Sequence, residues 1–92
     1  MYIEEWNWLD EDVEHLARHG VTPENVLGVW REDPRYRRNR KNRAASHQMI
    51  GPDKAGAFFA IFIRQDGDLE GLWRAVTGRR ANDVERDWWR GS

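Results

Sequence analysis

The sequence contains no cysteine among its 92 residues, and this absence excludes several kinds of chemistry. A chain without thiols cannot form disulfides, thiolate zinc sites or a cysteine nucleophile. It has only three prolines and shows no internal repeat, Pro-rich linker or low-complexity tract. We therefore expect packing alone to stabilise a single domain over residues 1–92.

Long apolar runs are also missing. No stretch approaches the roughly 18–20 apolar residues that cross a bilayer. The acidic start, with Glu4 and Glu5, lacks the basic segment of a signal peptide. We therefore expect a cytoplasmic protein with no membrane partner.

The chain does have a separation of charge, which its net charge of -1 hides. Residues 4–14 carry six acids and no lysine or arginine, whereas residues 35–43 carry six basic residues and no acid. The basic residues are Arg35, Arg37, Arg38, Arg40, Lys41 and Arg43. Such a block is either a solvated loop or face, or a patch that contacts phosphate. Because duplex DNA binders usually carry a domain-wide positive charge, a local patch in a near-neutral domain favours RNA.

Local signals predict two helices near the start of the chain. Asp10 is a candidate cap for a helix over residues 10–19, and Gly20 suits a Schellman stop. Thr22-Pro23 then supplies the cap and first residue of a second helix, which Asp33-Pro34 ends.

The middle of the chain predicts a sheet. Residues 48–51 form a short candidate strand, and residues 57–63 are a continuous apolar run typical of a central strand covered on both faces. Asp66-Gly67 is a hairpin signal that returns the chain into residues 69–77 as the antiparallel partner. The fold class we predict is α+β, with two N-terminal helices, an antiparallel β-sheet of three to four strands and a C-terminal helix.

Two arginines, Arg79 and Arg80, stand where the last predicted strand meets the last helix, which the capping-box pair Asn82 and Glu85 begins. A guanidinium group is a fixed cation whose planar donors match phosphate. The alternative is that Arg79 pairs with an acid of that helix, either Glu85 or Asp87.

Strand alternation predicts which side chains share a face near these arginines. Without a bulge, Trp73, Ala75, Thr77 and Arg79 would lie on one face of the sheet and Arg74 on the other. A bulge at Gly78 would change this assignment.

Several strings, together with the order of elements, carry a family resemblance. They are Trp6 or Trp8 with Asp10, then Arg18-His19-Gly20-Val21, then Ile50-Gly51, and finally Val76-Thr77-Gly78-Arg79-Arg80-Ala81-Asn82 followed by Glu85-Arg86 and Trp88. In these features the chain resembles the BrnT family, the ribonuclease toxins of type II toxin-antitoxin systems, which have a RelE-like fold. It departs from the family pattern at Pro52, where the family has arginine, and at Gly78, where alanine or methionine is usual.

This resemblance implies a metal-independent endoribonuclease that cleaves single-stranded RNA or mRNA, uses no cofactor and is neutralised by a protein antitoxin. By resemblance, Arg79 is the leading phosphate stabiliser, with Arg80 and Arg74 secondary. Whether the protein forms a homodimer is left open.

Two further residues could take part. His47 is a candidate general acid or base because its reference pKa lies near 6.5, although an ordinary surface histidine is the alternative. Tyr36, set among the basic residues, could stack on an RNA base or fold onto the sheet.

Other hypotheses use other residues. Glu11, His15 and His19 recur at helical spacing but lack a further ligand motif, so we expect no metal. Trp89 is expected to be exposed, as part of a partner surface. A non-catalytic module that binds nucleic acid or protein through residues 35–43, or a regulator that acts through residues 4–14 and Trp89, are the rival functions.

Overall fold

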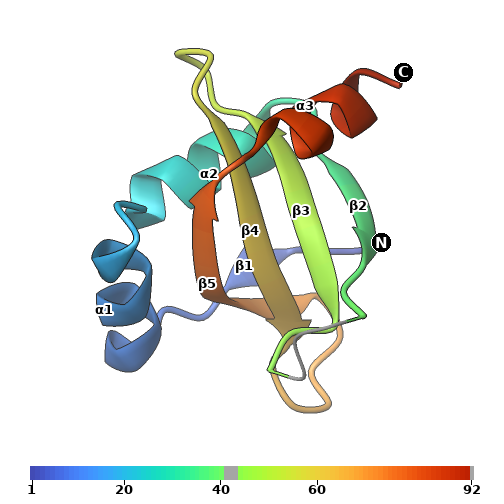
Figure 1. Ribbon diagram of the computed structural model, residues 1–92. Coiled ribbons are helices and arrows are strands. Elements are labelled where there is room, and N and C mark those ends of the chain that lie inside the picture. The colour runs from blue at the N-terminus through green and yellow to red at the C-terminus, as the bar shows by residue number, and fades with distance from the viewer. Residues whose placement is uncertain (41–43, 92) are drawn as a thin grey trace.

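The computed structural model describes residues 1–40 and 44–91. Within them the chain forms three helices and a five-stranded sheet (Figure 1). The elements are β1 (Glu5–Trp6), α1 (Asp10–Arg18), α2 (Pro23–Arg31), β2 (Arg35–Arg38), β3 (His47–Pro52), β4 (Phe58–Gln65), β5 (Leu72–Arg80) and α3 (Asp83–Arg90). The prediction of an α+β fold is confirmed.

The sheet differs from the prediction in strand number and direction. Its order is β1-β5-β4-β3-β2, and β1 runs parallel to β5, so the sheet is mixed and has more than the expected three to four antiparallel strands. β1 pairs only through Glu5 with Leu72 and Trp6 with Trp73. A strand of two residues is too short to show an alternating pattern, and β2 consists of charged and aromatic residues that read as a loop.

The helix ends follow the local signals closely. Val21 N–H donates to Leu16 O and Gly20 N–H to Ala17 O, each at 3.0 Å, which is the predicted Schellman stop. Gly20 has a positive φ of 74° there, which glycine adopts without strain. One detail of α1 is wrong, because its cap is Leu9, which makes no side-chain cap bond, and Asp10 is instead in the first helical turn.

The predicted capping box of α3 is present, and the predicted cap of α2 is a capping box as well. Thr22 and Asn25 exchange hydrogen bonds at the start of α2, and Asn82 and Glu85 do the same at the start of α3. These bonds satisfy backbone N–H groups that a helix start leaves without partners.

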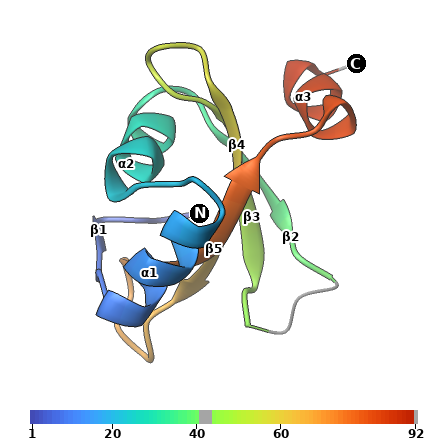
Figure 2. The ribbon, with the colours of Figure 1, turned by 60° about the vertical axis from the view of Figure 1, so that its left-hand side comes forward.

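The helices divide between the two faces of the sheet (Figure 2). α1 and α2 cover one face, here called the core face, and α3 lies on the other, here called the α3 face. The buried cluster of the core face includes residues of both helices, of the turn between them and of the central strands: Leu16, Val21, Val26, Val29, Met49, Phe59, Ile61 and Ile63. Within the described residues, none of the helices is long and apolar enough to cross a membrane.

A bulge in β5 changes which of its residues share a face. Phe62 pairs with Thr77 and Ile63 with Ala75, so Val76 is the extra residue. Ala75 therefore lies on the core face, whereas Thr77 and Arg79 lie on the α3 face, and the assignment of all three to one face is wrong.

The next residue, Gly78, faces α1. A Cβ atom there would lie 3.0 Å from Ile61 Cδ1 and 3.2 Å from Leu16 Cδ2, so glycine permits the close approach of the helix.

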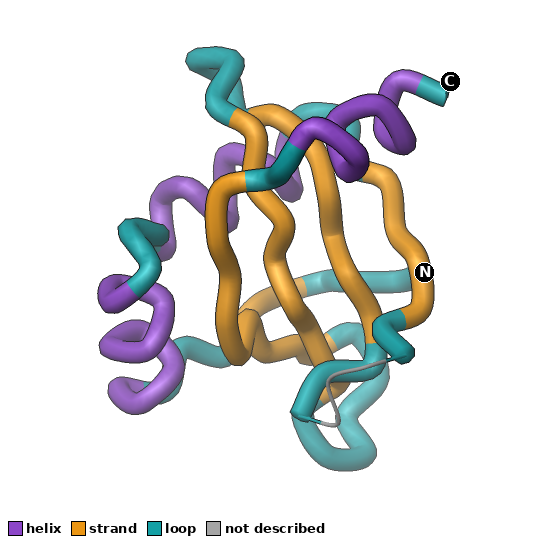
Figure 3. Tube along the Cα trace, viewed as in Figure 1, coloured by secondary structure: helices purple, strands orange, loops and turns teal. Residues whose placement is uncertain are grey.

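The strand register sorts the rest of the sheet by face. Arg37 pairs with Gln48, which pairs with Phe62, and these residues share the α3 face with Arg35 and Arg79. Tyr36 pairs with Met49, and Arg38 pairs with His47, which pairs with Ile63. Because Met49 and Ile63 belong to the buried cluster, Tyr36, Arg38 and His47 are on the core face. Figure 3 shows α3 at one end of the sheet, while the loop that joins β4 to β5 lies at the opposite end.

Candidate nucleic-acid interface

Two guanidinium groups converge on one carboxylate group on the α3 face. Arg79 Nη1 and Nη2 donate to Glu85 Oε1 and Oε2 at 2.6 and 2.7 Å, a bidentate pair. Arg37 Nη2 lies 3.9 Å from Glu85 Oε2. The alternative in which Arg79 pairs with an acid of the last helix is therefore the one observed, with Glu85 as the partner.

The carboxylate group is buried while the arginines are partly open. The side chain of Glu85 is 4% exposed, that of Arg37 35% and that of Arg79 43%. Burial alone would raise the pKa of Glu85, but hydrogen bonds from Arg79 and from the Asn82 N–H, with the charges of Arg79 and Arg37, outweigh it and lower the pKa. Glu85 is therefore a fixed anion, and each arginine keeps a side facing solvent.

The first arginines of the basic segment attach α3 to β2. Arg35 Nη1 donates to Trp88 O at 2.5 Å and to Trp89 O at 3.2 Å, which places a cation at the negative end of the helix. The Cζ atoms of Arg35 and Arg37 lie 4.6 and 4.8 Å from the centroid of the Trp88 ring. Arg37 Nε also donates to Gln48 Oε1 at 2.7 Å.

Trp89 is part of the same attachment. Its Nε1 donates to Asp33 O at 2.7 Å, and its ring meets Phe58 edge to face with centroids 5.3 Å apart. Trp89 is half-buried, so the expectation that it is exposed is wrong.

Beyond α3, this face offers an aromatic ring beside the cations. Phe62, Thr77 and Gln48 are half-buried, and Arg79 Cζ lies 5.6 Å from the centroid of the Phe62 ring. An aromatic ring can stack on a base of a single strand while neighbouring guanidinium groups hold phosphate. Sequence reasoning missed Phe62 and Gln48, because the apolar run of β4 does not reveal which of its side chains face α1 and α2 and which face the other side of the sheet.

His47, Tyr36 and Arg38 are together, but on the core face and away from Arg79. The ring of His47 meets that of Trp73 at 5.8 Å between centroids, and its Nδ1 lies 2.8 Å from Ser46 Oγ. Burial first, and then the charges of Arg38 and the amino terminus, lower the pKa of His47. The structure does not place this histidine beside the arginine named as the phosphate stabiliser.

The remaining sequence candidates are dispersed. Arg74 donates to both carboxylate oxygens of Asp12, from Nε at 2.9 Å and from Nη2 at 3.0 Å. Arg80 is exposed on the core face with its Cζ 5.3 Å from the Phe59 ring centroid, and Arg40 is exposed. Lys41 and Arg43 lie outside the described residues.

A metal site is not formed in the described part of the chain. The rings of His15 and His19 lie 5.4 Å apart, but no group of three or more potential ligands is placed to hold an ion there or elsewhere in residues 1–40 and 44–91.

Comparison with known proteins does not identify the chain. No family model matches the sequence, and no curated protein matches it. Arguments about function therefore depend on the arrangement of these side chains.

Proposed function

We propose that this domain binds single-stranded RNA on its α3 face and cleaves it in the cytoplasm without a metal ion, as a BrnT-like ribonuclease toxin that a protein antitoxin neutralises. The observation that carries the proposal is the convergence of Arg79 and Arg37 on the carboxylate group of Glu85. Guanidinium groups pair with carboxylate and phosphate oxygens through the same planar donors. The partly exposed guanidinium groups of Arg79 and Arg37 can therefore offer their solvent-facing donors to an RNA phosphate, whose charge competes with that of Glu85.

The order of elements adds support. A short strand, two helices, antiparallel strands and a closing helix follow one another here, as the BrnT resemblance implies. Arg79 and Arg80 end the last strand, immediately before α3. Pro52, the departure from the family pattern, is the last residue of β3 and supplies no phosphate contact.

For cleavage, the two guanidinium groups would stabilise negative charge on the phosphoryl oxygens as the 2′-oxygen attacks phosphorus. The reaction also needs groups that accept and donate protons. In the described part of the chain, the α3 face has no histidine, since His15 and His19 are on α1 and His47 is on the core face. This arrangement favours a second function, a non-catalytic module that binds RNA or a protein partner through the same face.

The test compares three variants in the same RNA-binding and cleavage assays, with EDTA present. Arg79→Gln should weaken RNA binding by at least about tenfold, because it removes a charged donor. Glu85→Gln should strengthen binding about fivefold, because it removes the competing charge from a partly exposed pair. Arg18→Gln is the matched control and should bind as wild type does, since Arg18 lies on α1 and its one ion pair among the described residues is with Glu14 of the same helix.

The outcomes separate the two functions. RNA cleaved by wild type in EDTA, and spared by Arg79→Gln, supports the ribonuclease. Binding that shifts in opposite directions in the two α3-face variants, with RNA left intact, supports the non-catalytic module. If Glu85→Gln binds RNA no more tightly than wild type while Arg79→Gln binds equally well, the α3 face is not the RNA site.

A further inference from the structure

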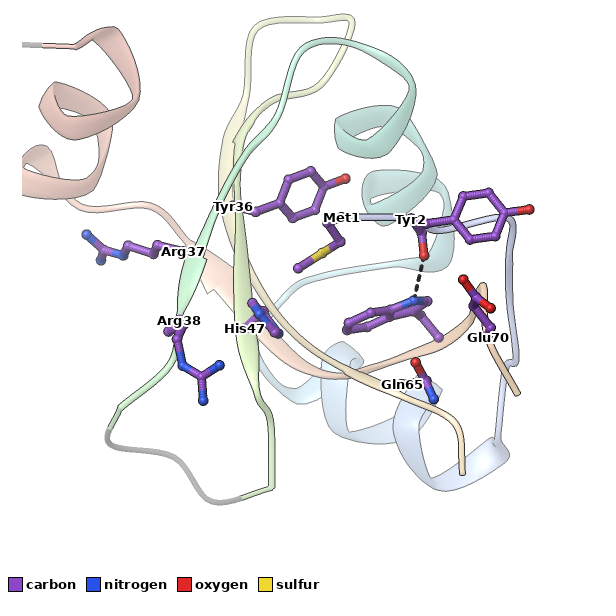
Figure 4. Close-up of a pocket in the computed structure, with 9 residues that line it drawn as sticks. Met1, Tyr2, Tyr36, Arg37, Arg38, His47, Gln65 and Glu70 are labelled. Carbon is purple, nitrogen blue, oxygen red and sulfur yellow. Dashed lines mark hydrogen bonds between the residues drawn. The ribbon is translucent and has the colours of Figure 1, made fainter. Parts of the chain in front are cut away.

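A cavity of about 550 Å³ opens on the core face beside β2, on the side of the sheet away from the Arg79 site (Figure 4). It is lined by side chains of β2, β3, β4 and β5, by the N-terminal residues Met1 and Tyr2, and by Glu70 of the β4–β5 loop. Ligand pockets in proteins have volumes of about 300–1,000 Å³. The cavity is therefore large enough for a small organic ligand.

The cavity walls are aromatic and fixed in place. Trp73 is 7% exposed, and its Nε1 donates to Tyr2 O at 3.0 Å. Tyr36 packs against the buried core, and burial raises its pKa to about 12, so the phenol stays protonated at neutral pH. The ring of His47 meets that of Trp73 edge to face, with centroids 5.8 Å apart. Flat rings at fixed positions favour a flat ligand.

A cation stands at the edge of the cavity. The side chain of Arg38 is exposed and makes no ion pair or hydrogen bond with any described residue, whereas those of Arg35 and Arg37 in the same strand both contact α3 or its neighbours. In Figure 4 the guanidinium group of Arg38 lies beside His47, while the side chain of Arg37 points away from the cavity. An anionic group of a ligand therefore has one available charged donor here.

Polar groups at the far side complete the lining. Gln65 Nε2 donates to Gly67 O at 3.0 Å, and the amide oxygen of Gln65 can accept a hydrogen bond from a ligand. Glu70 is exposed and supplies carboxylate oxygens. Both accept hydrogen bonds, which suits the amino and imino N–H groups of a nucleobase.

We infer that this cavity binds a nucleoside monophosphate, with the base among Tyr36, His47 and Trp73 and the phosphate on Arg38. The base gains stacking and edge contacts with the rings. A single available cation opposed by Glu70 favours one phosphate group over a triphosphate chain. The ligand is either a free nucleotide or the terminal nucleotide of an RNA strand, and the inference does not depend on the function proposed for the α3 face.

The experiment is a titration of the full chain, with any affinity tag at its C-terminus, followed by ¹H–¹⁵N NMR of the Trp73 indole and the His47 ring. AMP, GMP, CMP and UMP are each added, then the matching nucleosides and triphosphates. At least one monophosphate should shift both signals and bind more tightly than its nucleoside and at least as tightly as its triphosphate. If none of the monophosphates shifts either signal, or if nucleoside and monophosphate bind equally, the inference is wrong.

Variants locate the two halves of the ligand. Arg38→Gln should weaken monophosphate binding about tenfold, the value of one charged hydrogen bond, and leave nucleoside binding unchanged. Tyr36→Ala should weaken both, and Tyr36→Phe should weaken neither by more than about threefold. Arg31→Gln, which removes an exposed arginine of α2, should bind as wild type does. If Arg38→Gln and wild type bind the monophosphate equally well, the phosphate is not bound by Arg38 and this part of the inference is wrong.

A further arm distinguishes the source of the nucleotide and separates this inference from the α3-face proposal. A 5′-phosphorylated tetranucleotide that shifts Trp73 more strongly than the monophosphate does indicates an RNA end, and the reverse indicates a free nucleotide. Arg79→Gln should keep monophosphate binding whether or not it loses RNA binding. Loss of monophosphate binding in folded Arg79→Gln would contradict an independent cavity.

Discussion

The short strand β2 places arginines on both faces of the sheet, and their surroundings differ between the two faces. On the α3 face, Arg35 bonds to the carbonyl groups that end α3, and Arg37 lies near Glu85 and bonds to Gln48. On the core face, the side chain of Arg38 has neither an ion pair nor a hydrogen bond among the described residues and borders a cavity. The alternation of a strand thus divides one basic segment into arginines that contact α3 and its neighbours and an arginine whose side chain has no such contact.

The difference arises from what packs above each face. α3 brings a buried carboxylate group, two backbone carbonyl groups and an indole ring to the arginines of its face. Next to Arg38, the neighbouring side chain is the half-buried ring of His47, which carries no negative charge. A cluster of arginines in a sequence therefore says little about phosphate binding until the partner of each guanidinium group is known.

The largest effect on stability should come from breaking the buried pair of the α3 face. Arg79→Gln leaves the Glu85 carboxylate group with the Asn82 N–H at 2.9 Å and with Arg37 at 3.9 Å. Removing one partner of a buried ion pair costs about 3–5 kcal/mol, and the partial exposure of Arg79 reduces this, so we expect a loss of about 2–3 kcal/mol. Urea unfolding at pH 7 measures the change.

The matched control is Arg64→Gln, at an exposed position of β4 with no ion pair or side-chain hydrogen bond among the described residues. Its free energy of unfolding should change by less than about 0.5 kcal/mol. A loss in Arg79→Gln no greater than in Arg64→Gln would mean that the pair does not anchor α3, and the contrast between the faces would lose its energetic basis.

A smaller difference in the free energy of unfolding is expected between variants of Arg35 and Arg38, which lie three residues apart on the same strand. Arg35→Gln removes a cation from the carbonyl end of α3 and should cost about 1 kcal/mol. Arg38→Gln removes no contact and should be neutral. Amide hydrogen exchange provides the finer measurement, since residues 83–90 should exchange faster in Arg35→Gln and at the wild-type rate in Arg38→Gln. Equal protection of α3 in both variants would contradict the division of β2 by face.

Much of the fold could be predicted from local sequence. The Schellman stop at Gly20 and the capping box of Asn82 and Glu85 are decided by residues within one or two turns of each other, and both are observed. The apolar run that predicts the central strand corresponds to β4, whose odd-numbered residues from Phe59 to Ile63 are buried against the helices.

The parts that escaped prediction depend on residues far apart in the sequence. The bulge at Val76 is a property of the pairing of β5 with β4, and it decides that Arg79 lies on the α3 face, away from α1 and α2. β1 is defined by its pairing with β5, in which Trp6 lies opposite Trp73. The hydrogen bonds of the Arg35 side chain are made to carbonyl groups more than 50 positions away. Both partners of the Arg79 pair could be named from sequence, but the burial of Glu85 and the approach of Arg37 could not.

The smallest effect tests the other face through the titration of His47. Burial, and then the charges of Arg38 and the amino terminus, lower its pKa below the ordinary value of 6.5. Because the folded chain binds this proton less readily than the unfolded chain, the contribution of neutral His47 to stability is complete above pH 6.5. It is lost as the pH falls from there toward the lowered pKa. An NMR titration of the His47 ring should give a pKa below 6.5 in wild type.

Arg38→Gln should raise that pKa toward its ordinary value without reaching it, because burial, the larger cause, remains when the charge is removed. The other groups near the ring are Tyr36, which is neutral at these pH values, and Trp73, while Glu70 lines the same cavity. Arg31→Gln on α2 should leave the titration unchanged. If Arg38→Gln also leaves it unchanged, the guanidinium group of Arg38 does not act on the cavity, and the proposed phosphate contact there loses its support.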